Sequence, residues 1–252
     1  MKIALPNNIY ARLFSLYFPQ KYKDDIIYKP ASLLSKELTN ENVDIALIPS
    51  FDLLTHENFI VSKNFGISCD SLLSNANIYY APNKKEIGKI GLFGDVSSNE
   101  IILPRIIYPE KFSAEIKISL ETKPPDIYST NVIIVGDESF KDNYFNKGMS
   151  FAEEIAEIIG FPYVNFVLAS KDDELLEQFC NEIEPAKMII DEKIDLFFEN
   201  SDLSDEVKSF VKENIGSVYF ELTESETFGL GEMLKLAYYH GMIENIIDIK
   251  FI

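Results

Sequence analysis

The sequence predicts an α/β fold in which helices cover a largely parallel sheet. Three observations predict it: short apolar runs alternate with helical patterns, polar residues follow several of these runs, and the hydrophobic fraction of 46% is typical of globular proteins. The 252 residues suffice for one large domain or two small ones. Because strand carboxyl ends face the ligand crevice in such folds, the polar residues that follow them are the first candidates for a binding site.

The first third of the chain contains four predicted strands and one helix. The strand that starts at Val43 is the most informative, because its apolar run stops at Pro49 and leaves Ser50 at the tip. The helix before it is predicted from its regularly spaced leucines. The strands are expected at 2–5, 25–28, 43–48 and 76–80, and the helix at 32–38.

The middle third repeats this alternation. Ser97 and Glu100 have the spacing of a capping box, so a helix is expected to begin there. Pro104 should kink or shorten that helix, because proline cannot donate a backbone hydrogen bond. Strands are expected at 89–93, 115–120 and 132–135.

A helix from Ser150 to Ile159 is the clearest element in the sequence. Ser150 and Glu153 form a second capping box, and Gly160 ends the helix. The strand that follows is apolar except for Asn165, whose amide needs a hydrogen-bond partner if it is buried. That strand is expected at 163–169, and the last third is expected to be mainly helical, at 172–183, 204–214 and 224–240.

The charge balance restricts the class of partner. With 23 basic and 41 acidic residues, the formal net charge is −18. Nucleic acids and anionic membranes need clustered Lys and Arg, so neither is an expected partner. A small anionic ligand would need a locally favourable site, built from helix N-termini, hydroxyls, amides or an arginine such as Arg12.

Cysteine and histidine usage predicts neither a disulfide framework nor a metal site. Cys69 and Cys180 are the two cysteines, which fits a reducing compartment, and His56 and His240 lack other ligands at metal-binding spacing. The N-terminus has no apolar run of signal-peptide length, and no stretch reaches the roughly 18 apolar residues of a membrane span. We therefore expect a cytoplasmic protein without membrane contact. The oligomeric state stays open, with a homodimer as one option.

Six stretches, in order over nearly the whole chain, resemble the chorismate dehydratase family of the futalosine route to menaquinone. They are Val43–Ser50, Gly66–Asp70, Asp95–Ser98, Ile134–Asp137, Ser150–Glu154 leading to Gly160–Val164, and Val211–Ile215 leading to Leu222. The resemblance implies a two-lobed fold of the type II periplasmic-binding-protein kind, with mixed sheets flanked by helices and two crossing strands at the hinge. One lobe would comprise 1–80 plus 168–252, and the other 81–167.

The same resemblance implies a carbon–oxygen lyase that removes water from chorismate to give 3-[(1-carboxyvinyl)oxy]benzoate. It implies no metal or redox cofactor, and a small anionic, chorismate-like molecule as the partner. In this family the enolpyruvyl carboxylate of the substrate is thought to act as the base. The protein would then contribute positioning and hydrogen bonding.

Site residues follow from the same alignment of motifs. The family's opening Ser-Tyr-Leu-Asn corresponds to 7–14 in this chain, so the catalytic position falls on Tyr10 or, with a local shift, on Asn8. Substrate-binding residues are expected at strand tips and on the crossing strands. They are Ser50, Ser68, Cys69, Asn75, Ser97, Ser98, Asn99 and Asn165.

Other interpretations stay open at this stage. Ser97 and Ser98 also fit simple helix capping, Asp70 and Asp137 fit turn residues that accept backbone N–H groups, and Arg12 fits a surface residue. The main functional alternative is a non-catalytic cytoplasmic binder of a small carboxylate, favoured if Tyr10 rather than Asn8 fills the cleft. The futalosine-cleaving relatives rely on a site histidine, and neither histidine falls at a suitable strand tip.

Overall fold

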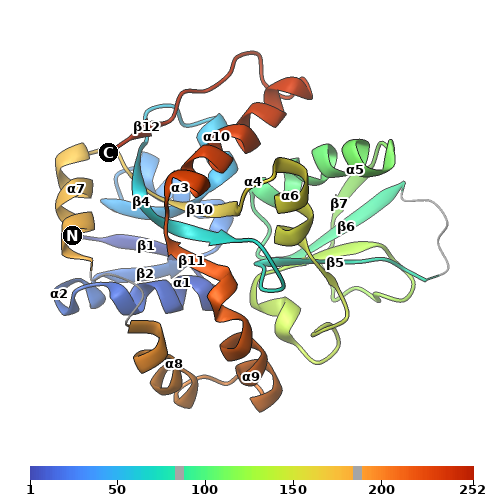
Figure 1. Cartoon of the computed structure of the whole chain (residues 1–252), viewed down its shortest axis with the longest axis horizontal. Helices are drawn as coiled ribbons and strands as arrows, with labels where there is room; N and C mark the ends of the chain where they lie inside the picture. Colours follow the sequence, from blue (N-terminus) through green and yellow to red (C-terminus); the bar gives the residue numbers. More distant parts are fainter. Residues whose placement is uncertain (83–87, 184–188) are drawn as a thin grey trace.

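The computed structural model describes residues 1–82, 88–183 and 189–252, which form two β-sheets with surrounding helices (Figure 1). The first sheet has the strand order β11-β4-β10-β3-β1-β2, with β12 paired to β4, and the second has the order β7-β6-β8-β5-β9. The strands are β1 (Ile3–Pro6), β2 (Ile26–Lys29), β3 (Ile45–Pro49), β4 (Ile60–Cys69), β5 (Ala76–Tyr79), β6 (Lys89–Gly94), β7 (Lys117–Leu120), β8 (Val132–Val135), β9 (Met149–Ser150), β10 (Tyr163–Ser170), β11 (Val218–Glu221) and β12 (Lys250–Phe251).

Helices flank both sheets, and several of the connections after strands are short 3-10 turns. The α-helices are α1 (Ile9–Phe14), α2 (Gln20–Lys23), α3 (Leu34–Thr39), α4 (Ser98–Ile102), α5 (Pro104–Phe112), α6 (Phe151–Ile159), α7 (Asp173–Glu182), α8 (Ile189–Glu199), α9 (Asp205–Asn214) and α10 (Glu224–Tyr239). The 3-10 turns are η1 (Ser15–Tyr17), η2 (Ala31–Leu33), η3 (Ser50–Leu54), η4 (Gly136–Phe140) and η6 (Ile215–Ser217). No helix of the described residues is long and apolar enough to cross a membrane.

The two sheets share one pattern of mixed pairing. In the first, β1 pairs in parallel with β2 and β3, and antiparallel β10 follows on the β3 side. In the second, β6 pairs in parallel with β7 and β8, and antiparallel β5 follows on the β8 side. Each sheet therefore directs the carboxyl ends of two adjacent parallel strands, β1 and β3 or β6 and β8, toward one edge. We call the half with the first sheet lobe 1 and the half with the second lobe 2.

The chain passes between the lobes twice. It leaves the first sheet after Cys69 and enters the second at Ala76, then leaves the second after Ser150 and returns at Tyr163. The two strands that we expected to cross, β5 and β10, flank these passages, each paired within one sheet. Counted by sheet membership, β5 thus lies in lobe 2 and the whole of β10 in lobe 1. The two lobes lie side by side in Figure 1, with both chain ends in lobe 1.

One predicted element differs in detail, and two observed elements were not assigned from the sequence. The helix expected after Ser97 is two helices, because Pro104 begins a new one directly after Leu103. The ten-residue strand β4 was not predicted, since polar Lys63 and Asn64 interrupt its apolar pattern; its pairing with β10, β11 and β12 holds it in the sheet. Helix α8 was not assigned as a separate element, because the charged segment 191–208 was interpreted as solvated helix faces and turns.

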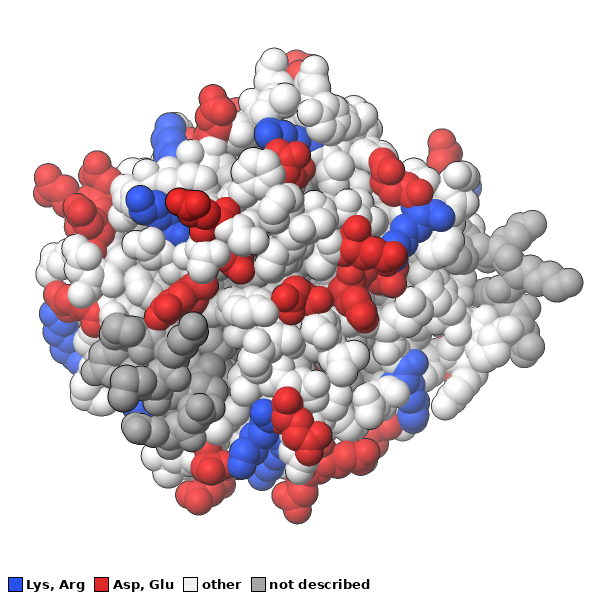
Figure 2. All heavy atoms as spheres, in the orientation of Figure 1, with Lys and Arg blue, Asp and Glu red and all other residues white. Residues whose placement is uncertain are grey.

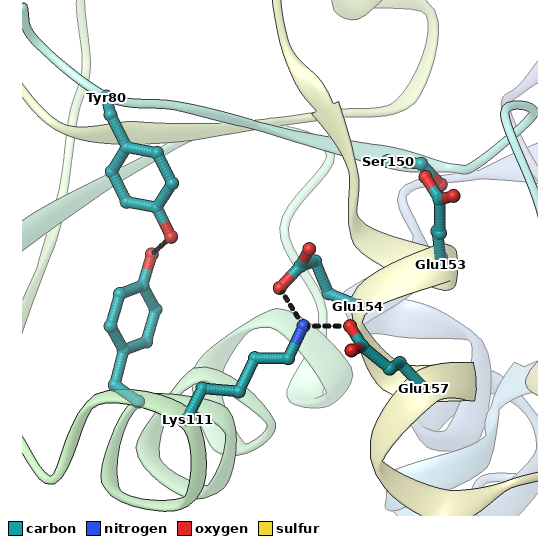
Figure 3. A network of polar contacts seen from close by, with 7 residues as sticks. Tyr80, Lys111, Ser150, Glu153, Glu154 and Glu157 are labelled. Atoms are coloured by element: carbon teal, nitrogen blue, oxygen red, sulfur yellow. Dashed lines mark hydrogen bonds and ion pairs between the residues drawn. The ribbon is translucent and has the colours of Figure 1, made fainter.

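A polar network attaches the second passage, which leads back to lobe 1, to helix α5 of lobe 2. The Lys111 ammonium on α5 lies 2.7 Å from a Glu154 carboxylate oxygen on α6 and also pairs with Glu157 (Figure 3). Nearby, the hydroxyls of Tyr80 and Tyr108 are 2.8 Å apart. Because α6 leads directly to β10, these contacts hold the second passage in place against α5.

Candidate functional site

The tip of β3 in lobe 1 and helix α4 of lobe 2 meet at the start of β10. Asn99, on α4 of lobe 2, is the centre of this meeting point. Its Oδ1 accepts from the Phe51 backbone N–H at 2.9 Å and from the Ser50 hydroxyl at 3.3 Å, both at the tip of β3. Its Nδ2 donates to the Asn165 carbonyl at 2.7 Å and to the Asn165 side chain at 3.3 Å. We call the set Ser50, Asn99, Asn165, Glu100 and Tyr163 the lobe junction.

The start of α4 carries a buried carboxylate. Ser97 caps the helix, and one Glu100 oxygen accepts from the Ser97 hydroxyl at 2.7 Å and from its backbone N–H at 2.9 Å. The capping interpretation of Ser97 is therefore correct. Glu100 is fully buried, and its second oxygen has no hydrogen-bond partner. Burial raises the pKa of Glu100, Asp95 adds to this, and the Ser97 hydrogen bonds oppose it.

We expect Glu100→Gln to flatten the dependence of stability on pH. Because its pKa is raised in the folded state, the wild-type protein takes up a proton on folding and gains stability as pH falls through that raised pKa. The gain ends once pH reaches the ordinary carboxyl range of about 4.3. The variant lacks this contribution, so it should be at least as stable as the wild type at pH 8.

Urea unfolding from pH 8 to pH 5 measures this effect. Asp95 and Asp137 titrate in both proteins, so the difference in slope reports Glu100 together with its interaction with Asp95. Glu177→Gln, at an exposed position on α7, is the matched control and should leave the slope unchanged. Parallel slopes for Glu100→Gln and the wild type would contradict the expectation.

The two candidates for the catalytic position lie at the start of α1. Asn8 caps the helix, its Oδ1 accepting from the Ala11 N–H at 2.9 Å, while its Nδ2 is buried without a partner. Tyr10 is buried, and its hydroxyl donates to the Ser74 carbonyl at 3.2 Å, at the entry to lobe 2. Tyr10 therefore fills space between the lobes, which is the arrangement that favours a binder.

The remaining predicted residues lie on β4 and just before β5. Ser68 and Cys69 are on opposite faces of β4, and Asn75 precedes β5. Cys69 pairs in register with Tyr163, whereas Ser68 pairs with Val164, so the two neighbours point to opposite faces. Cys69 is buried, and burial raises the pKa of its thiol, which disfavours the thiolate that a nucleophile needs. Asn75 is buried before β5, and its carbonyl accepts from the Gly136 N–H at 2.6 Å. The structure therefore brings Cys69 toward the lobe junction and leaves Ser68 apart from it.

Several buried polar atoms, at the lobe junction and elsewhere in the molecule, have no hydrogen-bond partner within the chain. In the described part of the chain these include, in order, Asn8 Nδ2, Ser68 Oγ, Asn75 Oδ1, Ser98 Oγ, Glu100 Oε1, Tyr163 Oη and Asn165 Nδ2. Burial raises the pKa of Tyr163, Glu100 adds to this, and the nearby Asn99 side chain opposes it. Leaving a buried polar group unpaired costs about 1–3 kcal/mol, so these atoms call for partners such as ordered water or a bound ligand. Most of these atoms can donate a hydrogen bond.

Sequence reasoning missed Glu100 and Tyr163 as members of the site. Glu100 was assigned to the capping box alone, and Tyr163 to an apolar strand. The signal that could have found Tyr163 is strand alternation, which places it on the same side as Asn165 unless a bulge intervenes. The register between β10 and β4 does shift between Val164 and Phe166, so alternation alone could not fix the face of Asn165.

Two grooves on the surface share the residues Arg12 and Asp137. One, of about 790 Å³, runs along the tips of β1, β2, β6 and β8 and is lined also by Lys29 and Asp95. The other, of about 1070 Å³, lies between η4 and the α8 region and is lined also by Lys141. The face seen in Figure 2 carries more acidic than basic side chains, and most of the basic ones lie beside acidic ones. No cluster of three metal-ligating side chains occurs among the described residues.

Comparison with known proteins supports the fold. No family model and no curated protein matches the sequence. Among solved structures, protein AF1704 from Archaeoglobus fulgidus has a TM-score of 0.60 at 11% identity, with 96% of this chain and 98% of that chain covered. The alkanesulfonate-binding protein SsuA from Xanthomonas axonopodis pv. citri, bound to MOPS, has a TM-score of 0.60 at 11% identity, with 98% and 95% covered.

A third neighbour names the fold directly. The Candida albicans CA3427 gene product, described as exhibiting the generic periplasmic binding protein structural fold, has a TM-score of 0.56 at 14% identity, with 97% of this chain and 91% of that chain covered. The predicted fold class, two mixed sheets flanked by helices in a periplasmic-binding-protein-like arrangement, is therefore confirmed.

Proposed function

We propose that the protein binds a small carboxylic acid between its two lobes. The observation that carries the proposal is the set of buried, unpartnered atoms at the lobe junction, together with the Ser98 hydroxyl beside it on α4. Asn165 Nδ2 can only donate, and the hydroxyls of Ser98 and Tyr163 can also do so. Oxygen-rich ligands such as carboxylates supply the acceptors that these groups lack. The sulfonate-binding neighbour shows that this fold can hold a small anion.

Glu100 sets a condition on the ligand's charge. A carboxylate beside an ionised Glu100 would be repelled, but the raised pKa of Glu100 favours its neutral form. A protonated Glu100 would donate a hydrogen bond to the ligand carboxylate, forming a carboxyl–carboxylate pair. Acid binding should therefore tighten as pH falls through the raised pKa of Glu100, and a neutral methyl ester of the same acid, which an ionised Glu100 does not repel, should show a smaller change.

Thermal stabilisation and calorimetry with a panel of small carboxylates, including chorismate and benzoate, test the proposal. We expect at least one acid to bind, and Asn165→Leu to weaken it about tenfold or more, the loss expected for one buried hydrogen bond to a charged group. Asn143→Ala, at an exposed loop position, is the control. Absence of binding across the panel, or equal binding by Asn165→Leu, would overturn the proposal.

Dehydration of chorismate, as a cytoplasmic lyase in menaquinone biosynthesis, is the second candidate. The ordered motifs favour it, since their residues Ser50, Ser97 and Asn99 lie at strand tips and on α4 where the lobes meet. Tyr10 and the capping role of Asn8 weigh against it. Chromatography of a chorismate reaction separates the two candidates: formation of the enolpyruvyl benzoate supports the lyase, and binding without turnover supports the binder.

A further inference from the structure

Two aspartates of lobe 2 contact backbone N–H groups of lobe 1. Asp137, directly after β8, accepts from the Ile9 N–H at 2.8 Å, and its other oxygen lies 3.1 Å from Arg12 Nη2. Asp95, directly after β6, accepts from the Ala31 N–H with both oxygens, at 2.9 and 3.1 Å. Ile9 begins α1 and Ala31 begins η2, so each aspartate occupies the free N–H at the start of a lobe 1 turn or helix.

These contacts lie progressively farther from the chain passages. In lobe 1, β4 and β10 lead to and from the passages, β1 lies two strands beyond β10, and β2 is the edge strand. In lobe 2, β5 receives the first passage, β8 is its neighbour, and β6 is the next strand. The Asp137 contact therefore joins β8 to β1, and the Asp95 contact joins β6 to β2 at the outer end of the lobe contact. A contact at that position resists a hinge opening more than one beside the hinge.

The grooves also indicate that the Asp137 contact lies where the two lobes meet. Arg12 and Asp137 line both the 790 Å³ and the 1070 Å³ groove, so their ion pair stands between the two. Burial raises the pKa of both aspartates, whereas the Ala31 N–H lowers that of Asp95, and the Ile9 N–H and Arg12 lower that of Asp137. The contacts between the lobes therefore stabilise the charged form of each carboxylate against the cost of burying it.

We propose that Asp95 and Asp137 are latches that keep the two lobes closed when no ligand is bound. Opening breaks both contacts, frees the Ile9 and Ala31 N–H groups to solvent, and joins the two grooves that meet at Arg12 and Asp137. The device depends on the lobe contact alone. It therefore holds whether or not the ligand is a carboxylate.

Hydrogen exchange and small-angle scattering of the ligand-free protein test the latch. In Asp95→Ala/Asp137→Ala, exchange at the Ile9 and Ala31 amides should rise about tenfold or more, and the radius of gyration should increase. Amides inside β3 and β10 should keep their wild-type protection, because they lie within lobe 1. Asp142→Ala, an exposed aspartate just after η4, is the control and should change neither measurement.

A second variant pair guards against a simple loss of folding. In Asp95→Asn/Asp137→Asn the side-chain oxygen still accepts from the N–H groups, so exchange should stay within about threefold of wild type. Unchanged exchange and radius in the alanine pair would overturn the proposal. So would a general loss of protection that includes β3 and β10, because the aspartates would then stabilise the whole fold and not the contact between lobes.

Discussion

Replacing Asn99 with alanine is expected to lower the free energy of unfolding by about 3–5 kcal/mol, a large loss for one side chain. The substitution leaves the buried Phe51 N–H and the Asn165 carbonyl without their partner, and each such group costs about 1–3 kcal/mol. Alanine is the better helix former, but this gain is only about 0.5 kcal/mol. The loss of hydrogen bonds therefore dominates.

Urea unfolding measures the loss, and a second substitution identifies its cause. Asn99→Asp keeps an oxygen toward the Phe51 N–H but places the other against the Asn165 carbonyl, so it should also be strongly destabilised at neutral pH. Asn143→Ala removes an exposed asparagine and should change stability by less than about 0.5 kcal/mol. A loss below about 1 kcal/mol in Asn99→Ala would show that Asn99 does not connect the lobes.

Residues at strand tips were the part of the site that the sequence could locate. Ser50 was placed because an apolar run stops at Pro49, and Asn165 because an amide inside an apolar strand needs a partner. Their common partner, Asn99, was named only through the family resemblance. Its hydrogen bonds to both depend on how the lobes approach each other, which neither periodicity nor spacing encodes.

The hydrogen-bond partners of the carboxylates could not be predicted from the sequence either. Asp137 was correctly expected to accept a backbone N–H group, but the donor, Ile9, lies 128 residues away in the other lobe and not in its own turn. Asp70, given the same interpretation, accepts from the Tyr219 hydroxyl on β11 instead. Local sequence rules predict that a short polar side chain at a strand end will accept a hydrogen bond. They do not predict which of many distant donors will supply it.

Gly94→Ala is expected to cost about 3 kcal/mol or more, the second of the two largest effects. Gly94 ends β6 with φ of +105°, a backbone conformation that residues with a Cβ rarely adopt. A Cβ built there would lie 2.1 Å from the Val135 carbonyl oxygen, which is backbone and cannot rotate away. The main chain of β6 or β8 would have to move.

That movement should reach the lobe contact, because Asp95 directly follows Gly94 and Asp137 follows Val135 by two residues. At urea concentrations where Gly94→Ala is still folded, we expect faster exchange at the Ala31 amide than in the wild type. Gly231→Ala is the matched control: its Cβ would meet nothing within 4 Å on helix α10, so it should stabilise the protein by about 0.5–1 kcal/mol. If Gly94→Ala proved as stable as the wild type, β6 and β8 would not approach as closely as described, and the positions of both latches would have to be revised.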